Sequence, residues 1–227
     1  MPEPDEQKVT VTRNGPYLVQ GSVPLSRLSI ATDAGGNSVG WREDGEVEAG
    51  DAYALCRCGH SADKPFCDGS HVRVGFDGTE TASRAPYLEQ ASEQDGPTLA
   101  LTDAQPLCAF ARFCDVGGQV WNLVEQEGPD AARQTALEAG LCPSGRLVAW
   151  DRATRQAIEP AFDPSVAVVG DPAQGVAGPL YVRGGIPVTG ADGETYEVRN
   201  RVTLCRCGAS RNKPFCDASH ASIGFTE

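Results

Sequence analysis

Two stretches of the chain carry the same set of potential metal ligands at the same spacing. Residues 55–71 read LCRCGHSADKPFCDGSH, and residues 204–220 read LCRCGASRNKPFCDASH. Both follow the pattern Cys-x-Cys-x8-Cys-x3-His, and the candidate ligands are Cys56, Cys58, Cys67 and His71 in the first copy and Cys205, Cys207, Cys216 and His220 in the second. Three thiolates and one imidazole complete the ligand set of a metal site. Because the whole set recurs, chance clustering is a poor explanation of it.

The spacing of these residues favours a two-iron centre. Cys-x-Cys brings two sulfurs close enough to bind one iron, and Cys67 with His71 would hold a second, giving a [2Fe–2S] cluster with one nitrogen ligand. The three residues between Cys67 and His71 fit one helical turn, and we expect Asp68 and Asp217 to cap the turns of the two copies. Zinc accepts the same ligands, but its usual first pair is Cys-x2–4-Cys. Colour separates the two alternatives, since a zinc protein is colourless and an iron–sulfur protein is reddish-brown.

The residues around these ligands resemble the CDGSH iron–sulfur family, the NEET proteins. The first copy matches the family motif at Cys56, Cys58, Ser61, Pro65, Cys67, Asp68, Gly69, Ser70 and His71, and the second at Cys205, Cys207, Ser210, Pro214, Cys216, Asp217, Ser219 and His220. Ala218 stands where the family has Gly, which costs strain if that position needs a positive φ. The resemblance implies a [2Fe–2S] cluster held by three Cys and one His in each copy. Family members generally pair two such motifs in a two-fold, β-rich assembly.

The duplication extends beyond the ligands. Residues 15–25 align with 178–188, and a strand is predicted to run into each Cys-x-Cys at 51–56 and 201–205. We therefore expect an α+β protein in which two β-rich CDGSH-type halves form an intramolecular pseudo-dimer, with an inserted small α/β ferredoxin-like segment. The expected domains are residues 1–80, 98–155 and 165–227. The stretch 32–50 is expected to be a surface loop, and the stretches 77–98 and 159–179 to be connectors.

The segment between the halves carries Cys108, Cys114 and Cys142, spaced Cys-x5-Cys … Cys-Pro. A bacterial ferredoxin run is Cys-x2-Cys-x2-Cys completed by a remote Cys-Pro, so the segment resembles a divergent mono-cluster ferredoxin in which Ala111 replaces the second Cys. Three thiolates and an alanine imply a [3Fe–4S] cluster, and Asp115 or water as a fourth ligand would give [4Fe–4S]. The alternative is three buried thiols that pack as small apolar side chains.

The same segment has its own succession of expected elements. A helix capped by Thr102 or Asp103 is predicted over 101–113 and a strand over 119–124. A second helix is predicted over 129–140, with Pro in its first turn and Gly at its end, and a strand over 145–151.

Composition limits the partners and the compartment. The chain has 227 residues and a net charge of −12, so nucleic acid and anionic membranes are poor partners and a basic redox protein is a better one. No apolar run approaches the roughly 18 residues of a membrane span, and the acidic N-terminus does not resemble a secretory signal. Nine cysteines without such a signal indicate a reducing compartment, so we expect a cytoplasmic protein with thiols as ligands.

Three functions fit these residues. The first is an electron-transfer protein that passes electrons to a redox partner protein. The second is a cluster donor to an apo-acceptor protein or a redox and iron sensor, because the nitrogens of His71 and His220 can be protonated. The third is a zinc-binding structural protein. We expect no enzyme, because the only other histidine is His60, whose counterpart is Ala209, and no nucleophile–base set is visible. A monomer is expected.

Overall fold

The computed structural model describes residues 7–227 and has three parts. The first half (residues 7–80) contains β1 (Lys8–Val11), β2 (Tyr17–Gln20), β3 (Leu25–Thr32), β4 (Ser38–Val47), β5 (Ala52–Leu55) and α1 (Ser70–Arg73). The middle segment (residues 85–160) contains α2 (Tyr87–Gln90), β6 (Ser92–Asp95), β7 (Leu99–Asp103), α3 (Val120–Val124), α4 (Pro129–Leu141), β8 (Leu147–Asp151) and β9 (Ala157–Ile158), with 3-10 turns at Gln105–Leu107 and Phe113–Gly118. The second half (residues 165–227) contains β10 (Ser165–Asp171), β11 (Val176–Arg183), β12 (Val188–Thr189), β13 (Arg201–Leu204) and α5 (Ser219–Ser222).

The two halves exchange strands. One sheet has the order β12-β1-β2-β5 and the other β13-β11-β10-β3-β4, so each takes a strand or a hairpin from the opposite half. The exchange is reciprocal, because β1 pairs in parallel with β12 and β10 pairs in parallel with β3. In each sheet the strand from the aligned stretches 15–25 and 178–188 then pairs with the strand that enters Cys-x-Cys, β2 with β5 and β11 with β13.

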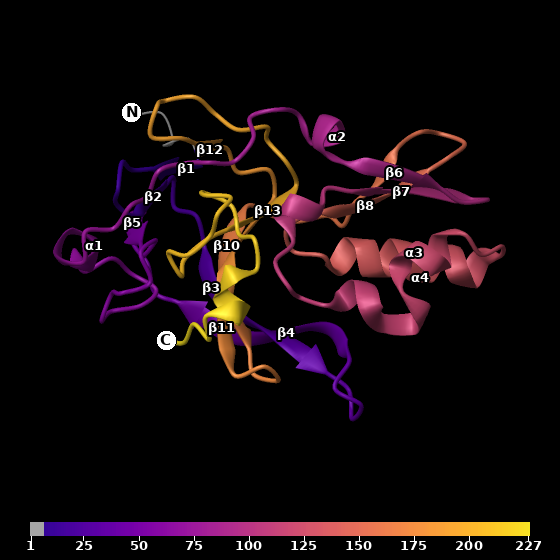
Figure 1. Cartoon of the computed structure of the whole chain (residues 1–227), viewed down its shortest axis with the longest axis horizontal. Coiled ribbons are helices and arrows are strands. Elements are labelled where there is room, and N and C mark those ends of the chain that lie inside the picture. Colours follow the sequence, from indigo (N-terminus) through magenta and orange to yellow (C-terminus); the bar gives the residue numbers. More distant parts are fainter. Residues whose placement is uncertain (1–6) are drawn as a thin grey trace.

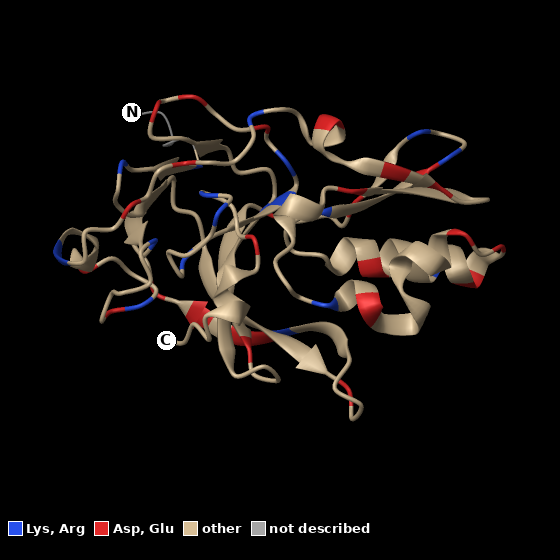
Figure 2. Ribbon diagram, viewed as in Figure 1, with Lys and Arg blue, Asp and Glu red and all other residues tan. Residues whose placement is uncertain are grey.

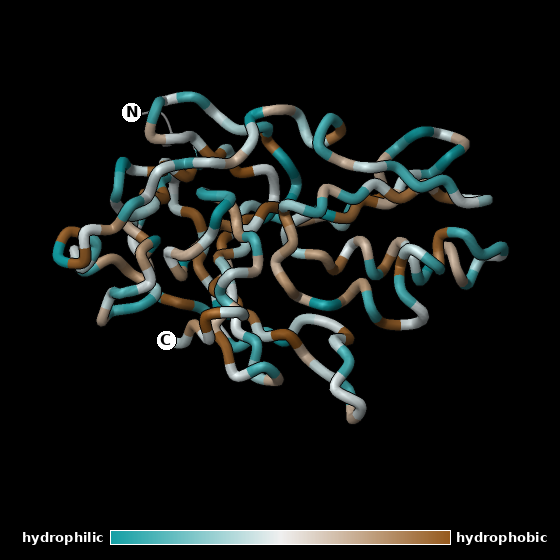
Figure 3. Tube along the Cα trace, viewed as in Figure 1, coloured by the Kyte–Doolittle hydropathy of each residue, from teal (hydrophilic) through white to brown (hydrophobic). Residues whose placement is uncertain are grey.

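One apolar core fills the space between these two sheets. It takes Val9, Tyr17 and Leu55 from the first half and Val166, Leu180 and Leu204 from the second, all of them at most 1% exposed. Apolar stretches accordingly gather along the central strands (Figure 3). Both halves contribute to this one core, and among the described residues neither half has a separate core of its own. Burial of apolar surface is the main favourable term in folding.

The middle segment forms a third layer beside the two halves. Its sheet has the order β6-β7-β8-β9, and α3 and α4 lie against it (Figure 1). Leu101, Val120, Ala139 and Leu147 make a separate small core between this sheet and the helices. The predictions of a helix over 129–140 and a strand over 145–151 are confirmed by α4 and β8.

Two predictions for the middle segment are wrong. Residues 101–113 are not a helix: they continue β7 and then turn irregularly, and Phe110 and Arg112 have φ of 58° and 62°, in the left-handed region that a helix does not allow. Residues 119–124 form α3 instead of a strand. A short apolar run fits both elements, and here the buried positions Val120, Leu123 and Val124 lie on one helical face.

Two predictions for the halves are also wrong in part. The stretch 32–50 is not all loop, because it contains β4, which forms backbone hydrogen bonds with β3. Most side chains of β4 are exposed, so its sequence lacks the apolar alternation that predicts a strand. The stretches expected to be connectors also contain regular elements. Residues 77–98 include α2 and β6, and residues 159–179 include β10 and the start of β11. Because β10 is a central strand, its residues 166–169 are buried on both faces and do not alternate.

No helix among the described residues is both long and apolar enough to cross a membrane.

Candidate metal centres

The ligands of each duplicated motif lie as two pairs. The Sγ atoms of Cys56 and Cys58 are 3.8 Å apart, and those of Cys205 and Cys207 are 3.7 Å apart. Two thiolates bound to one metal at about 2.3 Å with tetrahedral angles lie about 3.8 Å apart, so both pairs fit one ion each.

The second pair in each motif joins a thiol to an imidazole. Cys67 Sγ lies 3.4 Å from Nδ1 of His71, and Cys216 Sγ lies 3.4 Å from Nδ1 of His220. In the part of the chain that the structure describes, no three Cys, His, Asp or Glu side chains gather closely enough to bind a single ion. Each motif therefore presents its candidate ligands as two close pairs.

Backbone pairing brings the two ligand pairs of each motif to one place. The strand before the first Cys folds back on the loop before the third, so that Leu55 bridges Phe66 and Cys56 N–H donates to Pro65 O at 2.8 Å. The second motif repeats this with a bridge between Leu204 and Phe215. Backbone N–H groups also point at the sulfurs, as those of His60 and Gly69 do at Cys58 and Cys67.

The acidic residue after the third Cys holds the loop closed. Asp68 accepts from Ser70 N–H at 2.9 Å and from Ala62 N–H at 3.0 Å, and these hydrogen bonds keep the pKa of its carboxyl well below the usual range. Asp217 accepts from Ser219 and Arg211 in the same way. The predicted caps lie one residue before the N-cap positions, which Gly69 and Ala218 occupy. Each carboxylate accepts from the first N–H group of its turn and also binds the loop between the two ligand pairs.

The residue after each of these acids is left-handed. Gly69 has φ of 82° and Ala218 has φ of 71°. A positive φ strains the backbone of an alanine but not that of a glycine. The strain predicted for Ala218, which replaces the Gly of the family motif, is therefore present in the second motif.

The two motifs meet at their first cysteine pairs. Cys58 and Cys207 form an antiparallel backbone bridge. A Cβ on Gly59 would lie 2.6 Å from Cys207 O, and one on Gly208 would lie 2.5 Å from Cys58 O. Only glycine fits at these two positions.

Two arginines that the sequence analysis passed over lie beside this contact. Arg57 and Arg206, each between the first two ligands of a motif, are 1% and 3% exposed. Arg57 donates to Thr12 O and Gly78 O, whereas Arg206 donates to backbone oxygens and to the carboxylate of Glu227. The repeated Cys-Arg-Cys was a signal available in the sequence.

The three middle cysteines also come together. Cys108, Cys114 and Cys142 line one small cavity, with Ala111 and Arg146 on its wall, and Asp115 is not among its lining residues. Burial raises the pKa of the Cys114 thiol to about 12, and the neighbouring charges of Asp115, Cys142 and Cys108 add to this. Ser144 Oγ lies 3.5 Å from Cys142 Sγ. These three thiols are the donor set that a cluster with three protein ligands needs.

Comparison with known protein families separates these regions in the same way. Residues 14–72 and 177–221 match the family described as iron-binding zinc finger CDGSH type, and residues 94–152 match the divergent 4Fe-4S mono-cluster family. The chain carries two CDGSH-type regions with a divergent 4Fe-4S region between them. Both families bind iron, so this is an iron–sulfur protein. No curated protein and no solved structure matches the chain.

The 4Fe-4S region is tied to the second CDGSH-type region by a buried arginine. Arg201 is 1% exposed, and its Nη1 donates to the carbonyl oxygens of Ala139, Gly140 and Cys142 at 2.6–2.8 Å. These are carbonyls at the C-terminal end of α4, where positive charge is favourable. Arg201 begins β13, the strand that leads to Cys205, and so connects a ligand of the middle site to a ligand of the second site.

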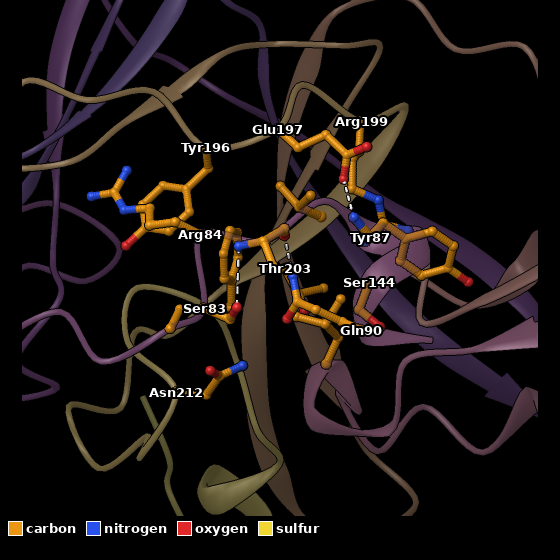
Figure 4. A pocket seen from close by; sticks show the side chains of 15 residues that line it. Ser83, Arg84, Tyr87, Gln90, Ser144, Tyr196, Glu197, Arg199, Thr203 and Asn212 are labelled. Atoms are coloured by element: carbon orange, nitrogen blue, oxygen red, sulfur yellow. Dashed lines mark hydrogen bonds between the residues drawn. The ribbon is translucent and has the colours of Figure 1, made fainter. Parts of the chain in front are cut away.

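A cavity lies beside the same junction (Figure 4). Arg84 stacks over the ring of Tyr196 at 3.6 Å and Arg199 over that of Tyr87 at 3.9 Å. Thr203 Oγ1 has no hydrogen-bond partner among the described residues. The cavity measures about 30 Å³, which suits one ordered water and no organic ligand.

Proposed function

We propose that this protein transfers electrons and carries two [2Fe–2S] clusters, each held by three Cys and one His, and a third cluster in the 4Fe-4S region. The observation that carries the proposal is the repeated arrangement of two ligand pairs, with 3.7–3.8 Å between thiols and 3.4 Å between thiol and imidazole. The first cluster would be held by Cys56, Cys58, Cys67 and His71, and the second by Cys205, Cys207, Cys216 and His220.

The pairwise arrangement favours a binuclear cluster over zinc. A single zinc ion needs four ligands around one point, whereas a [2Fe–2S] cluster needs two ligands at each of two irons. When bound, such a cluster supplies a one-electron centre whose nitrogen ligand raises its potential above the roughly −400 mV of all-Cys plant-type clusters. The chain itself directs backbone N–H groups at the sulfurs.

For the middle site we propose a [3Fe–4S] cluster on Cys108, Cys114 and Cys142. The cavity wall carries Ala111 at the position of the missing ligand and does not include Asp115. A [4Fe–4S] cluster would then need water as its fourth ligand.

We also propose that the two CDGSH-type regions act as an intramolecular pseudo-dimer and that the protein is a monomer. The reciprocal parallel pairs β1·β12 and β3·β10 and the bridge between Cys58 and Cys207 support this. Each region supplies what a second subunit would supply in a two-fold assembly.

We propose a redox partner protein and no catalytic activity of its own. The partner is a basic protein, because acidic residues outnumber basic ones by 31 to 19 and are spread over all three parts (Figure 2). The protein is expected in the cytoplasm. A second candidate, donation of a cluster to an apo-acceptor, is favoured by one observation, the half-buried state of His71.

Iron and sulfide analysis with electron paramagnetic resonance on anaerobically purified protein tests the proposal. Two [2Fe–2S] signals after reduction and one [3Fe–4S] signal in the oxidised protein are expected. Cys67→Ser should remove one [2Fe–2S] signal and leave the other, and Cys216→Ser should do the reverse. A colourless protein that contains zinc would refute the assignment, and rapid passage of intact cluster to an apo-ferredoxin would favour the donor.

A further inference from the structure

We propose that the two CDGSH-type sites are not equivalent: the first is open to solution and to partner proteins, whereas the second is enclosed by the middle segment. This inference rests on the proposed function, because it concerns how the two clusters of that function reach their surroundings.

Matched ligands of the two sites differ in exposure. His71 and Cys67 are half-buried, whereas His220 is 4% exposed and Cys216 is 3% exposed. Val72, the residue after the first ligand histidine, is 76% exposed. The first ligands, Cys56 and Cys205, are 3% and 2% exposed. At the second ligands the order is reversed, because Cys58 is buried and Cys207 is half-buried, so the first site is the more open one at its Cys–His pair alone.

An ion pair joins the middle segment to the end of β10, which pairs with β11, the strand against which α5 packs. Arg112 binds both carboxylate oxygens of Asp171, at 2.6 and 3.1 Å. The Asp171 side chain is 3% exposed. A buried bidentate pair fixes the two elements that it joins. Arg112 lies two residues before the middle-site residue Cys114, so this contact joins the loop of the middle site to the end of β10.

Apolar packing closes another side of the second site. Phe215, the residue before Cys216, packs against the cluster of Tyr87, Leu107 and Val148 from the middle segment. In the next contact along the loop, Asn212 Nδ2 donates to Pro106 O at 3.1 Å.

The first site has a different position. Its α1 lies at the edge of the molecule, far from α3 and α4, whereas the C-terminal helix of the second site lies in the centre (Figure 1).

This arrangement orders the three sites along the molecule. The second site faces the middle segment on one side, and on the other its backbone pairs with that of the first site at Cys58 and Cys207. The first site alone presents its Cys–His pair outward. We therefore assign exchange with external partners to the first site and exchange with the middle site to the second.

Access of a bulky iron chelator tests this assignment. Reduced holoprotein is mixed with bathophenanthroline disulfonate, and the amplitude of the [2Fe–2S] paramagnetic resonance signal is followed over time. We expect two phases of equal amplitude that differ at least tenfold in rate. Cys216→Ser, which keeps the first site, should show the fast phase only, and Cys67→Ser, which keeps the second, should show the slow phase only.

Opening the enclosure should reduce the difference in rate between the two sites. Arg112→Gln combined with Asp171→Asn removes both charges without leaving one buried and unpaired, and it should accelerate the slow phase at least fivefold while the fast phase stays unchanged. Arg133→Gln is the matched control, because Arg133 lies on α4 with its side chain 74% exposed. It should change neither phase.

The outcomes separate the two proposals. Equal rates for the two sites, or a slow first site, would overturn the non-equivalence while the clusters themselves remain. An Arg112→Gln/Asp171→Asn protein that keeps both signals and its slow phase would remove the enclosing role of this ion pair. Protein without iron and sulfide would instead refute the proposed function.

Discussion

Replacing Arg201 should loosen the middle segment from the second CDGSH-type region. Its guanidinium donates to four backbone carbonyls, those of Ala139, Gly140, Cys142 and Leu147, and to the carboxylate of Glu159. Arg201→Met keeps most of the aliphatic volume but removes every one of these donors. The four carbonyls then lose this donor, while those of Ala139 and Cys142 each keep one backbone partner, the N–H groups of Cys142 and Gly145.

The expected loss follows from burial. A buried acceptor that loses its partner costs about 1–3 kcal/mol, and breaking a buried ion pair costs about 3–5 kcal/mol. Glu159 is 24% exposed and regains part of its hydration, so the losses do not add in full. We expect a loss of about 4 kcal/mol in the free energy of unfolding for Arg201→Met. For Arg201→Lys, which keeps the charge but fewer donors, the expected loss is about 2 kcal/mol.

Urea unfolding of anaerobic protein, followed by circular dichroism, measures the loss as a lower midpoint at unchanged slope. The [3Fe–4S] signal should disappear at lower urea than the [2Fe–2S] signals, because Arg201 holds the carbonyl of the ligand Cys142. Arg133→Met, which changes an exposed arginine in the same way, should alter stability by less than about 0.5 kcal/mol. Equal midpoints for Arg201→Met and Arg133→Met would refute this reasoning.

Three further predictions concern single positions. Gly208→Ala should lower the free energy of unfolding by at least about 3 kcal/mol, because the new Cβ would lie 2.5 Å from Cys58 O. Gly175→Ala is the control, at a φ of 65° with nothing within 4 Å, and should lower it by only about 1 kcal/mol. Similar melting temperatures for the two variants would show that the contact between the motifs is not tight. Ala218→Gly should stabilise the second site by about 0.5–1 kcal/mol and Gly69→Ala should destabilise the first by a similar amount, measured by thermal unfolding, because both positions have a positive φ. Burial raises the pKa of Glu138 to about 7, so the folded protein holds its proton between about pH 4.5 and 7, and stability should fall as pH rises through 7. Glu138→Gln should remove about 2–3 kcal/mol of this pH dependence, and a wild-type stability that is flat from pH 5 to 8 would contradict the assignment.

Local sequence determined the ligand sets. The order Cys-x-Cys-x8-Cys-x3-His is a statement about neighbours along the chain, and a short loop that follows a strand can bring such neighbours together without help from distant residues. The strands before Cys56 and Cys205 and the caps at Asp68 and Asp217 are local for the same reason. The helix over 129–140 was also readable, because it is long enough to show its own start and end signals.

Only the tertiary structure decided how these parts combine. The parallel pairs β1·β12 and β3·β10 join residues far apart in the sequence, and the apolar run of β10 gave no alternation that would mark it as a strand. The short stretches 101–113 and 119–124 took the conformation that their packing demanded. The roles of Arg201 and Arg112 likewise depend on partners in another part of the chain, and a charged residue in sequence carries no sign of burial. The different exposure of His71 and His220 has the same origin, since their local sequences are nearly identical and the difference comes from tertiary packing, in which α5 lies against β11.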